Sequence, residues 1–291
     1  RTPCWCGASE EFWDKAKKKL NLDDEGLFQR FGDDFRRVYA TYSGPEFTFK
    51  NENATTRSVF GIERDGLGYG QPLTHPLSHA TLTEIHDYAW PDPDWMDVSR
   101  IKDEARRHRG QYAILGGDWS PFWHDAIDFL GMENFFIKMY TEPEIVDSVL
   151  QHIVDYYIEV SRRIFDVAGV EIDIFFIGND FGSQAGPLIS PELFKRYIFP
   201  QLRRFVNLGH DYNLKVQLHC CGGIWELLPL LIETGVDALH AVQQDCIGMD
   251  LLKIKSEFGN KVCFNGGIDS KKILIDGTPD FVKEQTRRVL N

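Results

Sequence analysis

The sequence predicts an α/β fold, and within that class a TIM (β/α)8 barrel formed by a single domain, residues 1–291. Apolar, strand-like runs alternate with helical patterns in the second half of the chain, and polar residues cluster where each run ends. Such alternation is typical of parallel βαβ units. The chain is also long enough for one full core, with 43% apolar and 26% charged residues among 291.

The second half of the chain carries the clearest pattern of elements. One helix opens with Ser190-Pro191-Glu192, which supplies an N-cap, a proline at the first helical position and an early acid. Apolar runs rich in β-branched and aromatic residues alternate with such helical segments. The predicted strands are residues 172–177, 215–221, 237–243 and 261–264, and the predicted helices are about 190–208, 224–233 and 250–258.

The first half is less regular but compatible with the same fold. Residues 2–6 predict a first strand, residues 113–115 predict another, and residues 143–166 predict a long amphipathic helix. Residues 42–97, rich in glycine, proline and aromatic side chains, predict an insertion or cover. Residues 278–290 form a helical pattern that stops in mid-helix, and the chain begins at Arg1, so we expect it to be cut at one or both ends.

Composition excludes some partners. The net charge of -12 repels polyanions, so nucleic acid is not expected as a partner. The chain has no apolar run of the roughly 18 residues that span a bilayer, so no membrane association is expected. Six cysteines in a chain of this length do not form a secreted disulfide framework, which predicts reduced thiols and a cytoplasmic protein.

The strongest chemical signal is the sequence His219-Cys220-Cys221 at the end of a predicted strand. Side chains two residues apart on a strand point the same way, so His219 and Cys221 converge while Cys220 faces the opposite side. Imidazole and thiolate together suit zinc. A buried histidine beside a core cysteine is the alternative interpretation. Cys4 and Cys6 repeat the spacing as a rival metal pair, although surface or core thiols are the favoured interpretation there.

Other polar residues follow the predicted strands and would share the carboxyl-terminal face of a barrel, where such enzymes hold their chemistry. Asp180 is a candidate base, substrate anchor or loop cap, and His240 fits a core or a site role equally well. The chain contains neither a complete phosphate-binding fingerprint nor a G-x-S-x-G elbow. The candidate substrate-binding residues are Asp180, Ser183, Gln184, Gln243 and Asp269, and the candidate catalytic residues are Asp180, His219 and Cys221.

Together these motifs resemble the uroporphyrinogen decarboxylase superfamily, whose members are TIM barrels. The resemblance covers most of the chain and is clearest between residues 178 and 277; residues 88–94 resemble the methyltransferase-like branch. The segments that carry it are Gly178-Asn179-Asp180-Phe181-Gly182-Ser183-Gln184, Gly186-Pro187-Leu188-Ile189-Ser190-Pro191-Glu192-Leu193-Phe194, His219-Cys220-Cys221-Gly222 and Phe264-Asn265-Gly266-Gly267-Ile268-Asp269.

The corrinoid-dependent methyltransferases of this superfamily carry a His-x-Cys with a later third ligand, and His219 and Cys221 match the first two. The resemblance implies a zinc ion that activates a thiol or other small methyl acceptor, and a separate corrinoid protein that presents the methyl group. In that family the third ligand lies near the C-terminus, past the end of this chain. Cys246 or Cys6 could replace it only if the geometry permits.

Two alternatives remain open. True uroporphyrinogen decarboxylases hold substrate carboxylates with an arginine-bearing loop near the N-terminus, and the corresponding residues here, 6–11, are acidic and lack arginine. A decarboxylase of porphyrin biosynthesis would therefore present the wrong charge to its substrate. The second alternative is a non-catalytic barrel that binds a tetrapyrrole or corrinoid without zinc chemistry.

Overall fold

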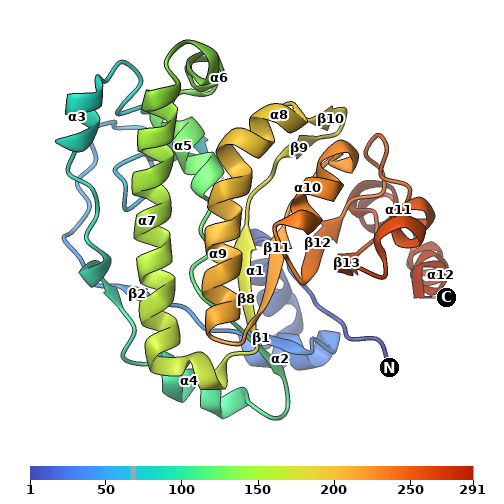
Figure 1. Cartoon of the computed structure of the whole chain (residues 1–291). Helices are drawn as coiled ribbons and strands as arrows, with labels where there is room; N and C mark the ends of the chain where they lie inside the picture. The colour runs from blue at the N-terminus through green and yellow to red at the C-terminus, as the bar shows by residue number, and fades with distance from the viewer. Residues whose placement is uncertain (67–69, 291) are drawn as a thin grey trace. The chain divides into compact units, whose positions relative to one another are not determined.

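The computed structural model describes residues 1–66 and 70–290, and Figure 1 traces the whole chain. The chain divides into two compact units. The first comprises Arg1–Leu115 and Asp125–Ile172, and the second comprises Gly116–His124 and Asp173–Asn291. The second unit contains all the carboxyl-terminal strand ends at which the sequence predicts functional residues.

The first unit is organised around the long helix α7 (Pro143–Ala168), which packs against α3, α4 and α6. Apolar residues such as Ile145, Val149 and Ile153 recur every three or four positions and are buried, which explains both the helix and its packing face. Strand β1 pairs with β7 in parallel. The other elements of this part of the chain are α1 (Glu10–Leu20), α2 (Asp24–Phe31), β1 (Phe35–Arg37), β2 (Thr41–Tyr42), β3 (Thr56–Arg57), β4 (Glu63–Asp65), β5 (Gln71–Pro72), α3 (Leu82–His86), η1 (Pro93–Trp95), β6 (Met96–Asp97), α4 (Ile101–His108), β7 (Ala113–Gly116), α5 (Phe122–Leu130), α6 (Met132–Thr141) and η2 (Gly169–Glu171).

The predicted strand at residues 2–6 is wrong. Residues 1–9 form no regular element, and the backbone N–H groups of Cys4 and Cys6 donate to the side-chain carboxylates of Asp34 and Asp33, at 2.7 and 2.8 Å. These carboxylates replace the backbone acceptors that a neighbouring strand would offer. The first strand of the chain is instead β1, whose residues the sequence pattern did not single out.

The second unit contains a parallel sheet in the order β8-β11-β12-β13, drawn from yellow to red in Figure 1. Helix α9 packs on β11. Parallel strands need long crossovers, and helices fill them here. The elements are β8 (Ile174–Gly178), β9 (Gly182–Ser183), β10 (Gly186–Pro187), α8 (Pro191–Leu193), η3 (Phe194–Ile198), α9 (Phe199–Asp211), β11 (Lys215–His219), η4 (Trp225–Leu227), α10 (Leu228–Glu233), β12 (Ala238–Val242), α11 (Leu251–Phe258), β13 (Cys263–Gly266), η5 (Ser270–Ile275) and α12 (Pro279–Leu290).

Capping residues set the helix starts, and the cap at Ser190 is the one that the sequence analysis names. The Ser190 side chain accepts a hydrogen bond from the N–H of Leu193, and Thr278 accepts one from Phe281. After the short α8, one π-helical turn, η3, leads into α9, so the predicted helix at about 190–208 is confirmed as a nearly continuous helical segment. The predicted long helix at 143–166 and strand at 113–115 are confirmed as well.

The α/β class is therefore confirmed, with parallel strands alternating with helices in the second unit. Closure into a complete eight-stranded barrel, the role of residues 42–97 as an insertion, and the single-domain division stay predictions. In the described part of the chain, every helix is too short or too polar to cross a bilayer.

Candidate metal centre

Sheet register places His219 beside two other strand-end positions. His219 pairs with Gly178 of β8 on one side and with His240 of β12 on the other, and His240 pairs with Asn265 of β13. Side chains of register partners in a parallel sheet point to the same face. The carboxyl end of the sheet thus brings two imidazoles together in one row.

Strand β11 ends at His219, two residues earlier than the sequence predicts, so Cys221 lies in the following loop. The loop still turns Cys221 back toward His219, with its Sγ atom 3.3 Å from the Nε2 atom of His219. Cys220 points elsewhere, as predicted: its buried Sγ accepts the N–H of Phe181 at 3.4 Å. The predicted convergence is confirmed, but the loop conformation produces it rather than strand alternation.

Asp180 completes a group of three ligand atoms. Its Oδ1 atom lies 3.4 Å from His219 Nε2 and accepts the backbone N–H of Cys221 at 2.7 Å. One ligand atom from each of Asp180, His219 and Cys221 lies within 4.8 Å of the other two, and the three residues are partly buried. Among the residues that the structure describes, this is the sole group of three or more histidine, cysteine or acidic side chains so arranged.

The three side chains also perturb one another's protonation. Burial lowers the pKa of His219, but its hydrogen bonds to Asp180 and Cys221 outweigh burial and raise the pKa to about 9. Burial raises the pKa of Asp180, and the interaction with His219 outweighs it, so this pKa lies below its usual value. Burial and the neighbouring His219 lower the pKa of His240 to about 3. Without metal, a cationic His219 therefore faces an ionised Asp180.

Two residues that the sequence analysis missed border this group. The Trp119 ring lies 5.4 Å from the His219 ring, between centroids. His124 accepts the backbone N–H of Asp180 through Nε2 at 3.1 Å, and the same atom lies 3.8 Å from Asp180 Oδ2. Both residues follow the predicted strand at 113–115, so the strand-end criterion, extended a few residues further along the chain, would have included them.

Other predicted substrate-binding residues make hydrogen bonds within the loops around the ligand group. Ser183 Oγ accepts the N–H of Ala185 at 3.2 Å and donates to the carbonyl oxygen of Gly186 at 3.0 Å, which closes the β9–β10 turn. Gln184 is exposed, and its backbone carbonyl oxygen accepts a hydrogen bond from the N–H of Ile247. A role for Ser183 and Gln184 in binding substrate stays a prediction.

Gln243 and Asp269 also have structural contacts. Gln243 Oε1 accepts the N–H of Gly222 at 3.1 Å, which places Gln243 one residue from the candidate ligand Cys221. Asp269 is buried, and its Oδ1 accepts the N–H of Lys272 at 3.0 Å at the start of η5. Their contact with substrate likewise stays a prediction.

The alternative thiols are not part of the group. Cys4 and Cys6 belong to the first unit, and Cys246 is buried in the second; none of them is among the three grouped ligands.

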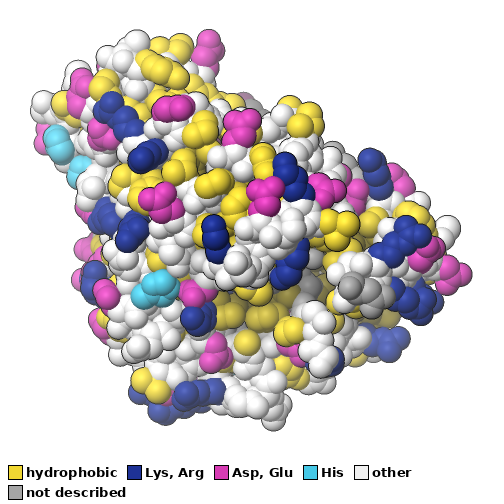
Figure 2. Space-filling model, turned by 45° about the vertical axis from the view of Figure 1, so that its right-hand side comes forward, with side chains coloured by type: hydrophobic (Ala, Val, Ile, Leu, Met, Phe, Trp, Pro, Cys, Tyr) yellow, Lys and Arg dark blue, Asp and Glu magenta, His cyan; other side chains and the backbone are white. Residues whose placement is uncertain are grey.

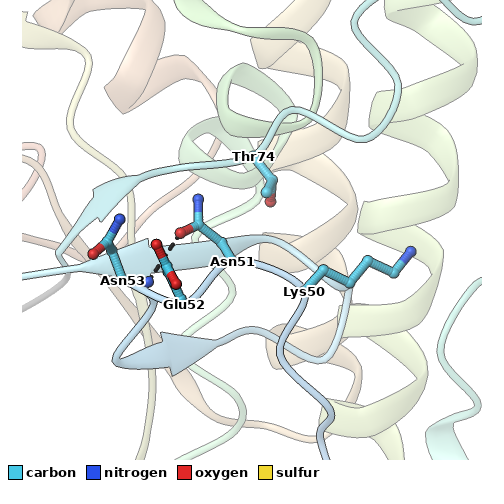
Figure 3. A pocket seen from close by; sticks show the side chains of 5 residues that line it. All are labelled: Lys50, Asn51, Glu52, Asn53 and Thr74. Carbon is cyan, nitrogen blue, oxygen red and sulfur yellow. Dashed lines mark hydrogen bonds between the residues drawn. The ribbon is translucent and has the colours of Figure 1, made fainter.

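In the first unit, an open surface depression is lined by Lys50, Asn51, Glu52, Asn53 and Thr74 (Figure 3). The Asn51 side chain there accepts the N–H of Asn53, as a turn residue does, and the depression holds none of the predicted site residues.

Basic and acidic side chains are interspersed over the face that Figure 2 displays. The prediction that the chain binds no nucleic acid rests on its net charge of -12.

Two curated relatives match two thirds or more of this chain. A methylated-thiol–coenzyme M methyltransferase from Methanosarcina mazei is 25% identical over 253 residues, which cover 82% of this chain and 64% of that protein. A methylcobamide:CoM methyltransferase from Methanosarcina acetivorans is 22% identical over 194 residues, which cover 67% of this chain and 54% of that protein. The chain thus spans between half and two thirds of the length of these relatives.

A solved structure described as a methyltransferase from Methanosarcina mazei resembles the chain with a TM-score of 0.62. It is 20% identical and covers 80% of this chain and 67% of its own, so the likeness concerns the fold. The family model described as uroporphyrinogen decarboxylase (URO-D) matches residues 96–291, which include Asp180, His219 and Cys221. Because this match extends over more than half of the sequence, the chain belongs to the uroporphyrinogen decarboxylase family.

Proposed function

We propose that this chain is a zinc-dependent methyltransferase that moves a methyl group between a corrinoid protein and a thiol or another small acceptor. The observation that carries the proposal is the convergence of Asp180, His219 and Cys221 at the carboxyl end of the parallel sheet. The two curated relatives, named for methyl transfer to coenzyme M, support the same reaction class. Their names pair a methylated thiol and a methylcobamide with coenzyme M, which supports methyl transfer that involves a thiol and a corrinoid.

The donor set fits a catalytic zinc site. Zinc accepts imidazole nitrogen, thiolate sulfur and carboxylate oxygen, and catalytic sites use three protein ligands with a fourth position open. His219 Nε2, Cys221 Sγ and an Asp180 oxygen provide one of each kind, within 4.8 Å of one another. When bound, the zinc ion would act as a Lewis acid that lowers the pKa of an acceptor thiol. Asp180 is therefore the third ligand in our proposal.

The surrounding residues hold these ligands in place. The backbone N–H of Cys221 donates a hydrogen bond to Asp180 Oδ1. The N–H of Gly222, the next residue, donates one to Gln243 Oε1. His124 Nε2 lies 3.8 Å from the other carboxylate oxygen of Asp180, Oδ2. The His124 side chain is 43% exposed, so it borders the solvent-accessible side of the group. We propose that His124 and Gln243 line the mouth through which substrate enters. The corrinoid comes from a separate protein in this proposal, and the cytoplasm is the proposed location.

Metal content tests the proposal first. Elemental analysis of the purified chain should find about one zinc per chain, and His219→Ala and Cys221→Ala should each lose it. Cys263→Ala is the matched control, because Cys263 is an exposed cysteine of the same unit outside the ligand group. Wild-type protein that binds no zinc under saturating conditions would contradict the proposed mechanism.

The reaction is tested separately. Zinc-loaded protein, free methylcobalamin and coenzyme M should give a zinc-dependent loss of the methylcobalamin absorbance, and His219→Ala should be inactive. Release of carbon dioxide from uroporphyrinogen by zinc-free protein would favour the decarboxylase instead. Binding of a corrinoid or tetrapyrrole without turnover would favour the non-catalytic barrel.

A further inference from the structure

His240 lies directly behind the candidate ligand His219, on the side away from the other two ligands. The Nδ1 atoms of the two rings are 2.8 Å apart, a hydrogen-bonding distance. The opposite nitrogen of His219, Nε2, lies 3.3 Å from Cys221 Sγ and 3.4 Å from Asp180 Oδ1. The His219 ring is therefore held at both of its nitrogens, with one nitrogen facing the ligand group and the other facing His240.

The fold fixes this pair before any ligand binds. His219 and His240 are register partners on adjacent parallel strands, so a shift of one residue would move the two rings to opposite faces of the sheet. His240 is 7% exposed, so water has little access to compete for the contact. Leaving a buried polar group without a hydrogen bond is destabilising, which favours keeping the two rings together.

Aromatic side chains confine both rings further. Trp119 lies beside His219 with ring centroids 5.4 Å apart, and Phe176 lies edge-on to His240 at 5.6 Å. Trp119 and Phe176 contact each other at 5.1 Å, so four rings form a closed circuit. Close packing of this kind restricts rotation of the imidazoles about their side-chain bonds.

The direction of the bond follows from the ligand group. A neutral imidazole carries one N–H, and the nitrogen that binds a metal must present its lone pair. If His219 binds through Nε2, its proton is on Nδ1 and is donated to His240 Nδ1. Metal-binding histidines generally donate their second nitrogen to such an outer partner, which sets the tautomer and the ring orientation.

We infer that His240 is a positioning residue: its Nδ1 accepts the Nδ1–H of His219 and holds His219 Nε2 toward Cys221 and Asp180. This inference rests on the proposed zinc function for its purpose, but the hydrogen bond itself does not require metal. A carbonyl or carboxylate is the usual partner of a ligand histidine, whereas here a second, buried imidazole takes that place.

Two variants of similar size separate hydrogen bonding from packing. His240→Asn places an amide group near the position of Nδ1 and keeps an acceptor, whereas His240→Leu removes it. We expect zinc affinity, measured by competition with a chromophoric chelator, to fall about 10- to 100-fold in His240→Leu. His240→Asn should restore most of that loss. Thermal unfolding of the zinc-free variants controls for damage to the fold.

A second measurement does not depend on zinc. In protein labelled with ¹⁵N-histidine, a scalar coupling between the two Nδ1 nuclei should be detectable across the hydrogen bond, with and without zinc. It should vanish in His240→Leu. Two rings that pack against each other without a hydrogen bond would show no such coupling.

The outcomes separate the inference from the proposed function. Coupling in a wild-type protein that binds no zinc would support the His219–His240 bond and overturn the zinc mechanism. Tight zinc binding by wild type and His240→Leu alike, or the absence of coupling in wild type, would overturn the positioning role and leave the zinc mechanism standing.

Discussion

At the scale of single residues, the candidate centre depends on contacts that converge on Asp180. Its carboxylate accepts the N–H of Cys221, lies 3.4 Å from the His219 ring and approaches His124. These contacts join residues from three separate segments of the chain. A carboxylate in this position both orders the loop that carries Cys221 and supplies an oxygen donor to the ligand group.

Asp180→Asn tests the carboxylate as a ligand. Asparagine keeps an oxygen that accepts the N–H of Cys221 but removes the negative charge, so zinc affinity should fall about tenfold to hundredfold while the unfolding midpoint changes little. Chelator competition measures the affinity, with Asp280→Asn on the exposed start of α12 as the control. Unchanged affinity in Asp180→Asn would remove Asp180 from the ligand set.

Glu25 gives a pH-dependent prediction in the first unit. Arg36, which is buried, donates two hydrogen bonds to the Glu25 carboxylate at 2.7 and 2.9 Å, and these lower the pKa of Glu25 to about 2. The folded-state pKa lies below the ordinary glutamate value of 4.5, so the stabilisation is present above pH 4.5 and is lost as pH falls toward 2.

Glu25→Gln should therefore lower the free energy of unfolding at pH 7 by about 1 kcal/mol, after allowance for solvent screening. The difference from wild type should shrink as pH falls below about 4.5. Urea unfolding at pH 7, 5 and 4 measures it, with the exposed Glu46→Gln as the control. A difference that grows at low pH would contradict the assignment.

At the scale of elements, the loop after β11 packs against the β9–β10 hairpin through two glycines. A Cβ atom on Gly222 would lie 2.4 Å from the carbonyl carbon of Gly182, and Gly222 has a φ of +93°. Both facts require glycine there. Because Gly222 follows Cys221 directly, this close approach of two backbones helps to set where the Cys221 thiol points.

Gly222→Ala should displace the loop or the hairpin, weaken zinc binding by more than about tenfold, and lower the unfolding midpoint. Gly186→Ala is the matched control: Gly186 has a φ of +138°, but a Cβ there meets no atom within 4 Å. It should cost about 1–3 kcal/mol of stability while keeping zinc. If both variants lost zinc equally, backbone strain alone, rather than the close contact with Gly182, would explain the weaker zinc binding.

At the scale of the whole molecule, thiol accessibility reports on the fold and on the candidate centre together. All six cysteines are thiols rather than disulfides; Cys4 and Cys263 are exposed, and Cys220 and Cys246 are buried. Burial raises the pKa of Cys220 well above its usual value, which suppresses the reactive thiolate. Cys221 is partly buried and is the one cysteine in the ligand group.

Alkylation mapped by mass spectrometry should therefore modify Cys4 and Cys263 quickly, and Cys220 and Cys246 only after unfolding. Cys221 should react in zinc-free protein and become protected when zinc is added. Cys263 serves as the internal control, because zinc should leave its rate unchanged. Equal reactivity of Cys221 with and without zinc would argue against its role as a ligand.

The sequence by itself determined the features that depend on local spacing. The alternation of strands and helices in the second half follows from apolar periodicity and from caps such as Ser190 and Thr278, whose hydrogen bonds span three residues. The convergence of His219 and Cys221 was predicted from their positions, two apart in the sequence, although the loop after β11 produces it rather than strand alternation. The family resemblance was confirmed by a family model that matches residues 96–291.

Tertiary structure decided what depends on contacts between distant segments. Residues 2–6 look like a strand, yet the N–H groups of Cys4 and Cys6 donate to the carboxylates of Asp34 and Asp33, which no local pattern reveals. His219 and His240 are some 20 residues apart in sequence, and the pairing register of their two strands places His240 behind His219. Asp180 joined the ligand group only because two loops meet. Local propensity acts within a few residues, whereas register and loop packing require the whole fold to form.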